Sequence, residues 1–351
     1  MSWLTEIARP EIRALKAYEH AAWEPGLLRL HANELPWRSH GDASAAGLNQ
    51  YPEPHPHALT AALASYYGLE PARVLAARGS DETIDLLIRS YCRAGTDGVL
   101  VCPPTFGMYT VAARIQGAAV IEVPLRREQG FACDFDALRV RCDDRVKLVF
   151  LCSPNNPTGN RFDSDAIVAL ARELQGRALL VIDEAYVEFA AQPSLIGMLD
   201  ASPGLVVLRT LSKAHALAGA RCGALIAHPD VVALLRKVIQ PYAVTQLTIE
   251  AVFRALEPVA LERASAHLET IRRERSRVAA ALAGCRSVRR VWPSEANFLL
   301  VEFADARAAL ERTRAAGLLV RDLRTVPQLE QAVRISIGSP DQNDRLLASL
   351  P

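Results

Sequence analysis

Short apolar segments alternate with segments of helical periodicity from residue 58 to about residue 245. Apolar strands that are separated by helices are typical of a mainly parallel sheet covered by helices on both faces. We therefore expect an α/β fold over this part of the chain. The expected strands are 74–77, 98–104, 118–125, 146–154, 178–186, 205–211 and 222–229.

The pattern changes after residue 245, where a long Arg- and Glu-rich helical stretch (247–284) leads into short strands and a helix at 305–316. This arrangement predicts a second, smaller α+β domain. At 351 residues the chain is long enough for two domains. We expect a large domain at 29–245, a small domain at 246–351, and an N-terminal segment (1–28) that joins the small domain and covers the substrate entrance.

Charge and cysteine content narrow the function classes. The 40 Lys and Arg residues nearly balance the 39 Asp and Glu residues, so no basic excess favours nucleic acid or an anionic membrane surface as a partner. The seven cysteines are scattered and have no CxxC spacing, which supports neither a metal site nor a disulfide framework. No signal peptide or membrane span is visible, so we expect a soluble cytoplasmic protein.

Polar residues stand where several of the predicted strands end. Strand 178–182 ends in Asp183, strand 205–209 is followed by Thr210, Ser212 and Lys213, strand 146–152 leads into "SPNNPTG", and strand 74–77 leads into "RGSDE" at a helix start. Each could be only structural, as a helix cap or a tight turn. Ligands of open α/β sheets, however, bind beyond the carboxyl ends of the strands.

Together these residues supply what one cofactor requires. A lysine whose pKa is lowered by burial can form an imine with an aldehyde. A buried carboxylate can keep a pyridine nitrogen protonated, and a helix N-terminus, hydroxyls and an arginine can bind a phosphate. The sequence therefore predicts pyridoxal 5′-phosphate bound to Lys213.

The run SPNNPTG…DEAY…TLSKAHALAGARCG resembles the fold-type I aminotransferases of class II, and the resemblance covers essentially the whole chain. "RLHANELPW", "YPEPHP", "SEANFLLV" and "VRISIGSPDQN" are similar to segments of the histidinol-phosphate aminotransferases. The resemblance implies a large domain with a mainly parallel, seven-stranded sheet between helices and a smaller α+β domain.

The same resemblance implies roles around the cofactor ring. Lys213 binds the aldehyde and moves the proton, and Asp183 pairs with the pyridine nitrogen. Tyr186 and Asn156 hydrogen-bond the phenolic oxygen, and Phe106 stacks on the ring at a position where tyrosine is common. The implied phosphate contacts are Ser80, Asp81, Thr210, Ser212 and Arg221, with Tyr51 from a neighbouring subunit of a homodimer.

Other residues match the substrate contacts of that family. Arg334 corresponds to the arginine that binds the substrate carboxylate, and Arg321 and Tyr18 correspond to phosphate contacts. Asn33 lies in a segment that lines the substrate pocket, and Asn156 also faces the substrate. Two residues, His31 and Trp37, depart from the pattern of that family. They either pack against the imidazole end of the pocket or reshape it.

The implied reaction is amino transfer from L-histidinol phosphate to 2-oxoglutarate in histidine biosynthesis, giving imidazole-acetol phosphate and glutamate. Three alternatives are open at this point. The chain could be an aminotransferase for aromatic or other amino acids, a threonine-phosphate decarboxylase, or a ligand-sensing domain without catalysis. The cofactor-binding residues alone do not determine which substrate side chain the protein accepts.

Overall fold

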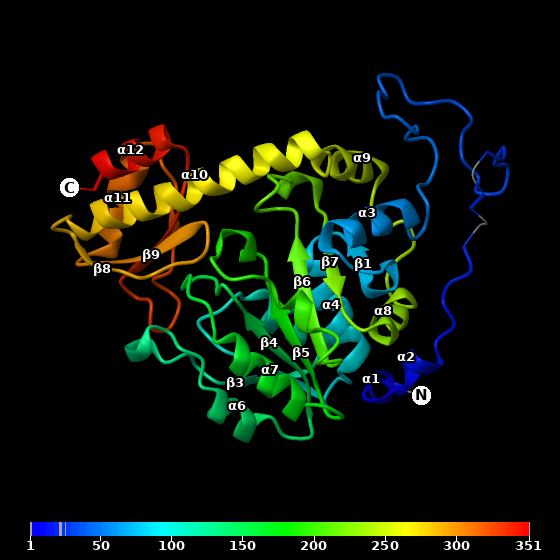
Figure 1. Cartoon of the computed structure of the whole chain (residues 1–351), viewed down its shortest axis with the longest axis horizontal. Helices are drawn as coiled ribbons and strands as arrows, with labels where there is room; N and C mark the ends of the chain where they lie inside the picture. The colour runs from blue at the N-terminus through cyan, green and yellow to red at the C-terminus, as the bar shows by residue number, and fades with distance from the viewer. Residues whose placement is uncertain (1, 21–22, 25, 351) are drawn as a thin grey trace.

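The computed structural model describes residues 2–20, 23–24 and 26–350. Its central element is a seven-stranded sheet with the strand order β1-β7-β6-β5-β4-β2-β3 (Figure 1). β7 runs antiparallel to β1 and β6, and the remaining neighbours are parallel, which confirms the mainly parallel sheet expected from the sequence. The strands are β1 (Val74–Ala77), β2 (Gly98–Val101), β3 (Ala119–Glu122), β4 (Val146–Cys152), β5 (Leu179–Asp183), β6 (Leu205–Thr210) and β7 (Gly223–Ile226).

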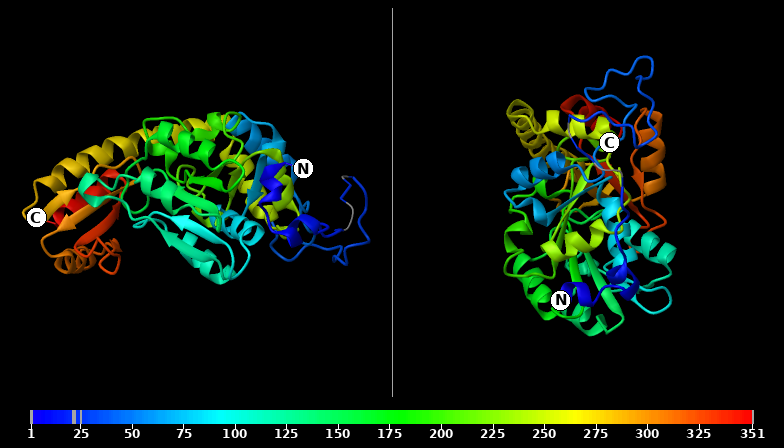
Figure 2. Two further views of the ribbon diagram at one scale, coloured as in Figure 1. Left: turned by 90° about the horizontal axis from the view of Figure 1, so that it is seen from below. Right: turned by 90° about the vertical axis from the view of Figure 1, so that its right-hand side faces the viewer.

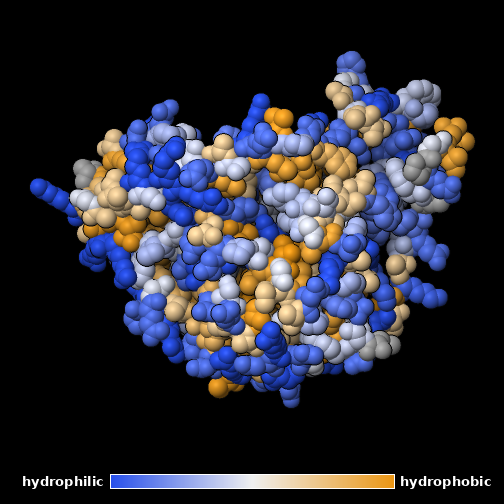
Figure 3. All heavy atoms as spheres, viewed as in Figure 1, coloured by the Kyte–Doolittle hydropathy of each residue, from blue (hydrophilic) through white to orange (hydrophobic). Residues whose placement is uncertain are grey.

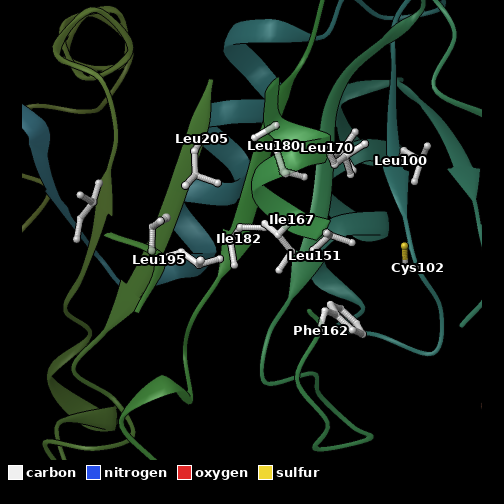
Figure 4. Packing of buried hydrophobic residues seen from close by; sticks show 14 of the residues in the cluster. Leu100, Cys102, Leu151, Phe162, Ile167, Leu170, Leu180, Ile182, Leu195 and Leu205 are labelled. Carbon is white, nitrogen blue, oxygen red and sulfur yellow. The ribbon is translucent and has the colours of Figure 1, made fainter. Parts of the chain in front are cut away.

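Helices cover both faces of this sheet because its central strands are apolar on both sides. Leu180 and Ile182 of β5 face one hydrophobic cluster, and Leu179 and Val181 face the other. Figure 4 shows the first cluster, in which Ile167 packs close to β5. The first face is covered by α3 (His57–Tyr67), α6 (Phe135–Arg141), α7 (Ser164–Glu173) and α9 (Gln246–Ala255), and the second by α4 (Ser80–Tyr91), α5 (Met108–Gln116) and α8 (Pro229–Arg236).

The small domain is a four-stranded antiparallel sheet with the order β10-β11-β9-β8. Its own hydrophobic cluster includes Val278 and Phe303. Figure 2 shows this domain at one end of the molecule, joined to the rest by the long helix α10. The elements are α10 (Pro258–Ala283), β8 (Val288–Val291), β9 (Phe298–Phe303), α11 (Ala306–Ala315), β10 (Arg321–Asp322), β11 (Ala332–Ser336) and α12 (Pro340–Ala348).

The helical stretch expected at 247–284 is two helices rather than one. α9 ends at Ala255, and α10 begins at Pro258, which occupies the first helical position. Proline has no backbone N–H and disfavours helical geometry in the residue before it, so a continuous helix cannot pass through this point.

The start of the chain packs on the large domain. Leu4 of α1 (Trp3–Glu6) and Ala8 are buried in the second cluster, and the Tyr91 hydroxyl donates to the Leu4 carbonyl at 3.1 Å. This differs from our expectation that residues 1–28 join the small domain, because the apolar side chains near residues 4–8 are buried against α4 and α8 instead. Among the described residues, no helix is long and apolar enough to cross a membrane.

After α2 (Pro10–Ala14), the described residues before residue 44 project from the body of the molecule (Figure 1). The segment then returns to the body, where the Ala45 N–H donates to Glu250 of α9 and the Tyr242 N–H donates to the Pro54 carbonyl. We call residues 15–56 the N-terminal arm. Large hydrophobic side chains on the arm are exposed, and Figure 3 shows apolar atoms on this projection at the upper right. They include Leu27, Leu28, Leu30, Leu35 and Trp37.

Replacing Gly223 with alanine is expected to lower the free energy of unfolding by about 1–3 kcal/mol, the usual cost of overpacking. Gly223 lies opposite Ala77 and Thr210 in the sheet. An added Cβ would lie 2.8 Å from the Arg209 carbonyl oxygen and 2.9 Å from the Gly79 backbone. Both are backbone atoms, so relieving these contacts would require the backbone to shift. Urea unfolding measures the effect. Gly197→Ala, where a Cβ meets nothing within 4 Å, is the control, and an equal loss in both variants would contradict the explanation.

Candidate active site

One pocket lies where the carboxyl ends of β4, β5 and β6 meet the start of α4. β1 runs in the same direction as β6, since both are antiparallel to β7, so the turn after β1 reaches the same edge of the sheet. The pocket is lined by every cofactor residue predicted from the sequence except Tyr51, and by two residues that were not predicted. The lining residues are Ser80, Asp81, Phe106, Cys152, Asn156, Asp183, Tyr186, Thr210, Ser212, Lys213, Ala218 and Arg221.

Lys213 follows β6 and lines the pocket. Its amine lies 5.9 Å from the centre of the Tyr186 ring. Partial desolvation, followed by the positive charges of Arg334 and Arg221, lowers the pKa of this amine. A lowered pKa raises the fraction of neutral amine, which is the form that attacks an aldehyde.

Asp183 is the buried acid at the base of the pocket and is only 2% exposed. Its Oδ2 accepts a hydrogen bond from the Tyr109 hydroxyl at 2.8 Å, and its Oδ1 accepts one from the Ala185 N–H at 3.1 Å. Burial raises the pKa of Asp183 to about 6, although both hydrogen bonds act in the opposite direction. The helical periodicity indicates only that Tyr109 is a core position, so its contact with Asp183, 74 residues away in the chain, was not predicted from the sequence.

The raised pKa of Asp183 predicts a pH-dependent stability of the cofactor-free protein. Between the usual value of 3.8 and about 6, folded Asp183 holds a proton that the unfolded chain has released. The free energy of unfolding of the wild type, relative to Asp183→Asn, should therefore fall by up to about 3 kcal/mol as the pH rises from 4 to 7. Chemical unfolding of both proteins at each pH tests this. A difference that is constant or grows with pH would show that Asp183 is ionised at little cost.

A cluster of donors suited to an anion occupies another wall of the pocket. Helix α4 begins at Ser80, so the N–H groups of its first turn have no partner within the helix. Arg221 lies beside them, 3.2 Å from the Asp81 carboxylate, and the Thr210 hydroxyl donates to the Ser212 hydroxyl at 2.9 Å. The donors and the charge of Arg221 suit a phosphate in kind.

Gly79 has a backbone conformation that residues with side chains rarely adopt, and the Arg221 side chain lies against it. Gly79 has φ +83°, and an added Cβ would lie 2.9 Å from Nη2 of Arg221. Arg221 itself has a φ of +56°, which is uncommon for a residue with a side chain. Such a conformation persists where the surrounding structure fixes it, and at binding sites in particular.

Arg334 of β11 connects the small domain to the pocket. Its Nη1 donates to Oδ1 of Asn156, and Nδ2 of Asn156 donates to the Tyr186 hydroxyl at 3.4 Å. The guanidinium lies 5.2 Å from the centre of the Phe298 ring, and burial lowers its pKa. Arg321 lies directly across the strand pair from Arg334 but is exposed.

Three predicted residues lie apart from this pocket within the same chain. Asn33 and Tyr51 line a separate hollow together with Tyr242, and the rings of Tyr51 and Tyr242 stack at 4.7 Å. Tyr18 is 72% exposed on the N-terminal arm. Within one copy of the chain, none of these three residues lines the pocket around Lys213.

Of the two departures noted in the sequence, Trp37 is exposed on the arm, and His31 is also on the arm. Neither residue lines the pocket around Lys213. Their influence on the substrate end of a site stays a prediction.

Solved structures share this fold. A histidinol-phosphate aminotransferase from Clostridium acetobutylicum superposes with a TM-score of 0.78 at 22% identity, covering 86% of this chain and 90% of that one. The enzyme of the same name from Sinorhizobium meliloti, in complex with pyridoxal 5′-phosphate, gives a TM-score of 0.74 at 28% identity, over 86% and 82% of the two chains. The fold is therefore that of the fold-type I aminotransferases.

The aminotransferase class I and II family model matches residues 31–350, and the chain belongs to this family. Among curated relatives, the histidinol-phosphate aminotransferase of Stenotrophomonas maltophilia strain R551-3 is 51% identical over 98% of this chain and 95% of its own length. A relative of the same name from Xanthomonas euvesicatoria is 46% identical over 99% and 97% of the two chains.

Proposed function

We propose that this aminotransferase uses pyridoxal 5′-phosphate to transfer the amino group of L-histidinol phosphate to 2-oxoglutarate. The observation that carries the proposal is the 51% identity, over nearly the full length, to a relative named for that reaction. The products would be imidazole-acetol phosphate and glutamate, as a step of histidine biosynthesis.

The pocket residues fit the proposed cofactor in kind. When bound, the cofactor supplies an aldehyde and an electron-withdrawing pyridine ring. Lys213 would bind the aldehyde carbon, Asp183 would hold the ring nitrogen, and Asn156 and Tyr186 would donate hydrogen bonds to the phenolic oxygen. Phe106 would pack on the ring face. Ser80, Asp81, Thr210, Ser212 and Arg221 would hold the phosphate.

Lys213 would also carry the proton in the reaction. Its amine is partly desolvated and lies among the pocket residues, so once released it can take a proton from the substrate carbon and return it at another atom. The positive charges of Arg334 and Arg221 keep the pKa of the amine low and so favour the accepting form.

The two substrates share an anionic group, and Arg334 is placed to bind it. A guanidinium can bind a carboxylate or a phosphate monoester by donating two parallel hydrogen bonds to its oxygens. One site could thus take the phosphate of one substrate and a carboxylate of the other in turn. Arg321, next to Arg334 across the strand pair, would add a second positive charge, and Asn156 would contact the substrate beside Arg334.

We further propose a cytoplasmic homodimer in which the arm of one copy completes the site of the other. In a single copy the arm exposes large hydrophobic side chains, which is typical of a surface that another chain covers. Tyr51 would reach the cofactor phosphate of the neighbouring copy, and Tyr18 and Asn33 its substrate. Light scattering should give twice the mass of the 38.3 kDa chain, and a monomeric mass would refute this assembly.

The reaction is tested with purified protein and added cofactor by following glutamate formation from L-histidinol phosphate and 2-oxoglutarate. Phenylalanine and threonine phosphate are offered in parallel, and release of CO₂ is measured with the latter. We expect kcat/KM for L-histidinol phosphate to exceed that for phenylalanine by at least about 10²-fold, because an unfilled phosphate site leaves charged groups unpaired. Faster turnover of phenylalanine, or CO₂ release, would contradict the assignment.

A further inference from the structure

Tyr109 lies behind Asp183, outside the set of residues that line the pocket. We infer that Tyr109 is a positioning residue that fixes the Asp183 carboxylate and keeps it ionised for the contact it would make with the ring nitrogen of the cofactor. The inference rests on the proposed function, since it concerns how this chain supports the cofactor ring.

The Asp183 carboxylate is held by one protein donor on each oxygen. The Ala185 N–H binds Oδ1, and the Tyr109 hydroxyl binds Oδ2. Ala185 is only two residues away in the chain, so its hydrogen bond constrains the acid locally. Tyr109 comes from α5, 74 residues earlier in the sequence, and it ties the carboxylate to the helix layer.

When Asp183 is ionised, the Tyr109 hydroxyl is the donor in this contact. Tyr109 is fully buried, and burial beside Asp183 raises the pKa of its phenol well above the usual range, so the proton stays on the oxygen. A hydrogen bond to an ionised acceptor is stronger than one to a neutral acceptor. The contact therefore favours the charged form of Asp183, whereas burial disfavours it.

The ring of Tyr109 is held by two other aromatic side chains. It stacks on Phe150 of β4 with ring centres 4.9 Å apart, and it meets the edge of Phe106 at 5.6 Å. Phe106 lines the pocket. This packing fixes where the hydroxyl points, and phenylalanine at position 109 would retain the packing while removing the hydroxyl alone.

The test compares Tyr109→Phe with Tyr91→Phe in the cofactor-loaded protein. Tyr91 is equally buried and is the last residue of α4, whereas Ser80 at the start of this helix lines the pocket. The Tyr91 hydroxyl donates to the Leu4 carbonyl, so this control loses a buried hydrogen bond outside the pocket. The readouts are the ¹⁵N NMR shift of the ring nitrogen in labelled pyridoxal 5′-phosphate, the cofactor dissociation constant, and kcat and KM separately.

In Tyr109→Phe we expect the nitrogen shift to move toward neutral pyridine, because a more basic Asp183 takes the shared proton. Cofactor affinity and kcat should each fall by about tenfold, the scale of losing one hydrogen bond to a charged group, with KM unchanged. Tyr91→Phe should lower the unfolding midpoint and leave the nitrogen shift as in the wild type.

A wild-type nitrogen shift in Tyr109→Phe, or the same change in both variants, would overturn the inference. The proposed function fails in a different way. In that case the wild-type protein itself would show no cofactor absorbance that depends on Lys213.

Discussion

Lys213→Ala should lower kcat for amino transfer by about 10⁴-fold or more, because one side chain acts both as the group that binds the aldehyde and as the acid–base group. The pKa of Lys213 is lowered by desolvation and by two neighbouring arginines. An amine added with the buffer would not be held in this environment, so it should not replace the lysine. Glutamate formation measures the loss, and the absorbance band of the bound cofactor should disappear with it.

The matched control is Lys147→Ala. Lys147 lies on β4, where its amine donates to the Asp144 carbonyl at 2.8 Å at the surface of the protein. This variant should keep both activity and absorbance within about twofold of the wild type, as surface substitutions usually do. If Lys213→Ala kept the cofactor band and more than a tenth of the activity, another amine would have to serve, and the assignment of Lys213 would be wrong.

Arg334→Lys should lower kcat/KM by about 10²- to 10³-fold for both substrates, the scale expected when a partly buried charged contact is broken. Lysine keeps the positive charge but lacks the planar pair of donors. It also cannot bind Oδ1 of Asn156 and a substrate oxyanion in the geometry of the guanidinium. We expect the loss mainly as an increase in KM, measured separately for L-histidinol phosphate and 2-oxoglutarate.

Arg324→Lys serves as the control for Arg334. Arg324 follows β10 and forms an exposed ion pair with Asp322 at 2.8 Å, so its replacement should leave KM nearly unchanged. If Arg334→Lys raised KM for only one of the two substrates, the idea that one arginine binds both would be refuted. The cofactor absorbance should be normal in both variants.

The strands of the large sheet were predictable because they are apolar on both faces and are separated by helices. β5 and β6 lie within the predicted segments 178–186 and 205–211, and Asp183 and Thr210 end them as expected. The helical stretch at 247–284 was confirmed, but it is divided into two helices because Pro258 interrupts the helical hydrogen bonds between them. The short strands expected after the helix at 305–316 correspond to β10 and β11, although β10 is only two residues long.

The pocket itself was largely predictable for a topological reason. Residues that follow parallel strands must meet at one edge of the sheet, so Asp183, Ser212 and Lys213 could be placed together before the fold was known. Arg334 was identified only through resemblance to a family. Its position beside Asn156 depends on how the small domain packs, which strand order in the large domain does not fix.

The sequence by itself determined the fold class and which side chains stand at the ends of the strands, since both follow from local patterns of apolar and polar residues. Only the tertiary structure decided that Tyr109 holds Asp183, and that Tyr51 stacks on Tyr242 in a hollow separate from the pocket of Lys213. Contacts of that kind join residues far apart in the sequence. They depend on the packing of whole helices and segments, and no spacing along the chain encodes them.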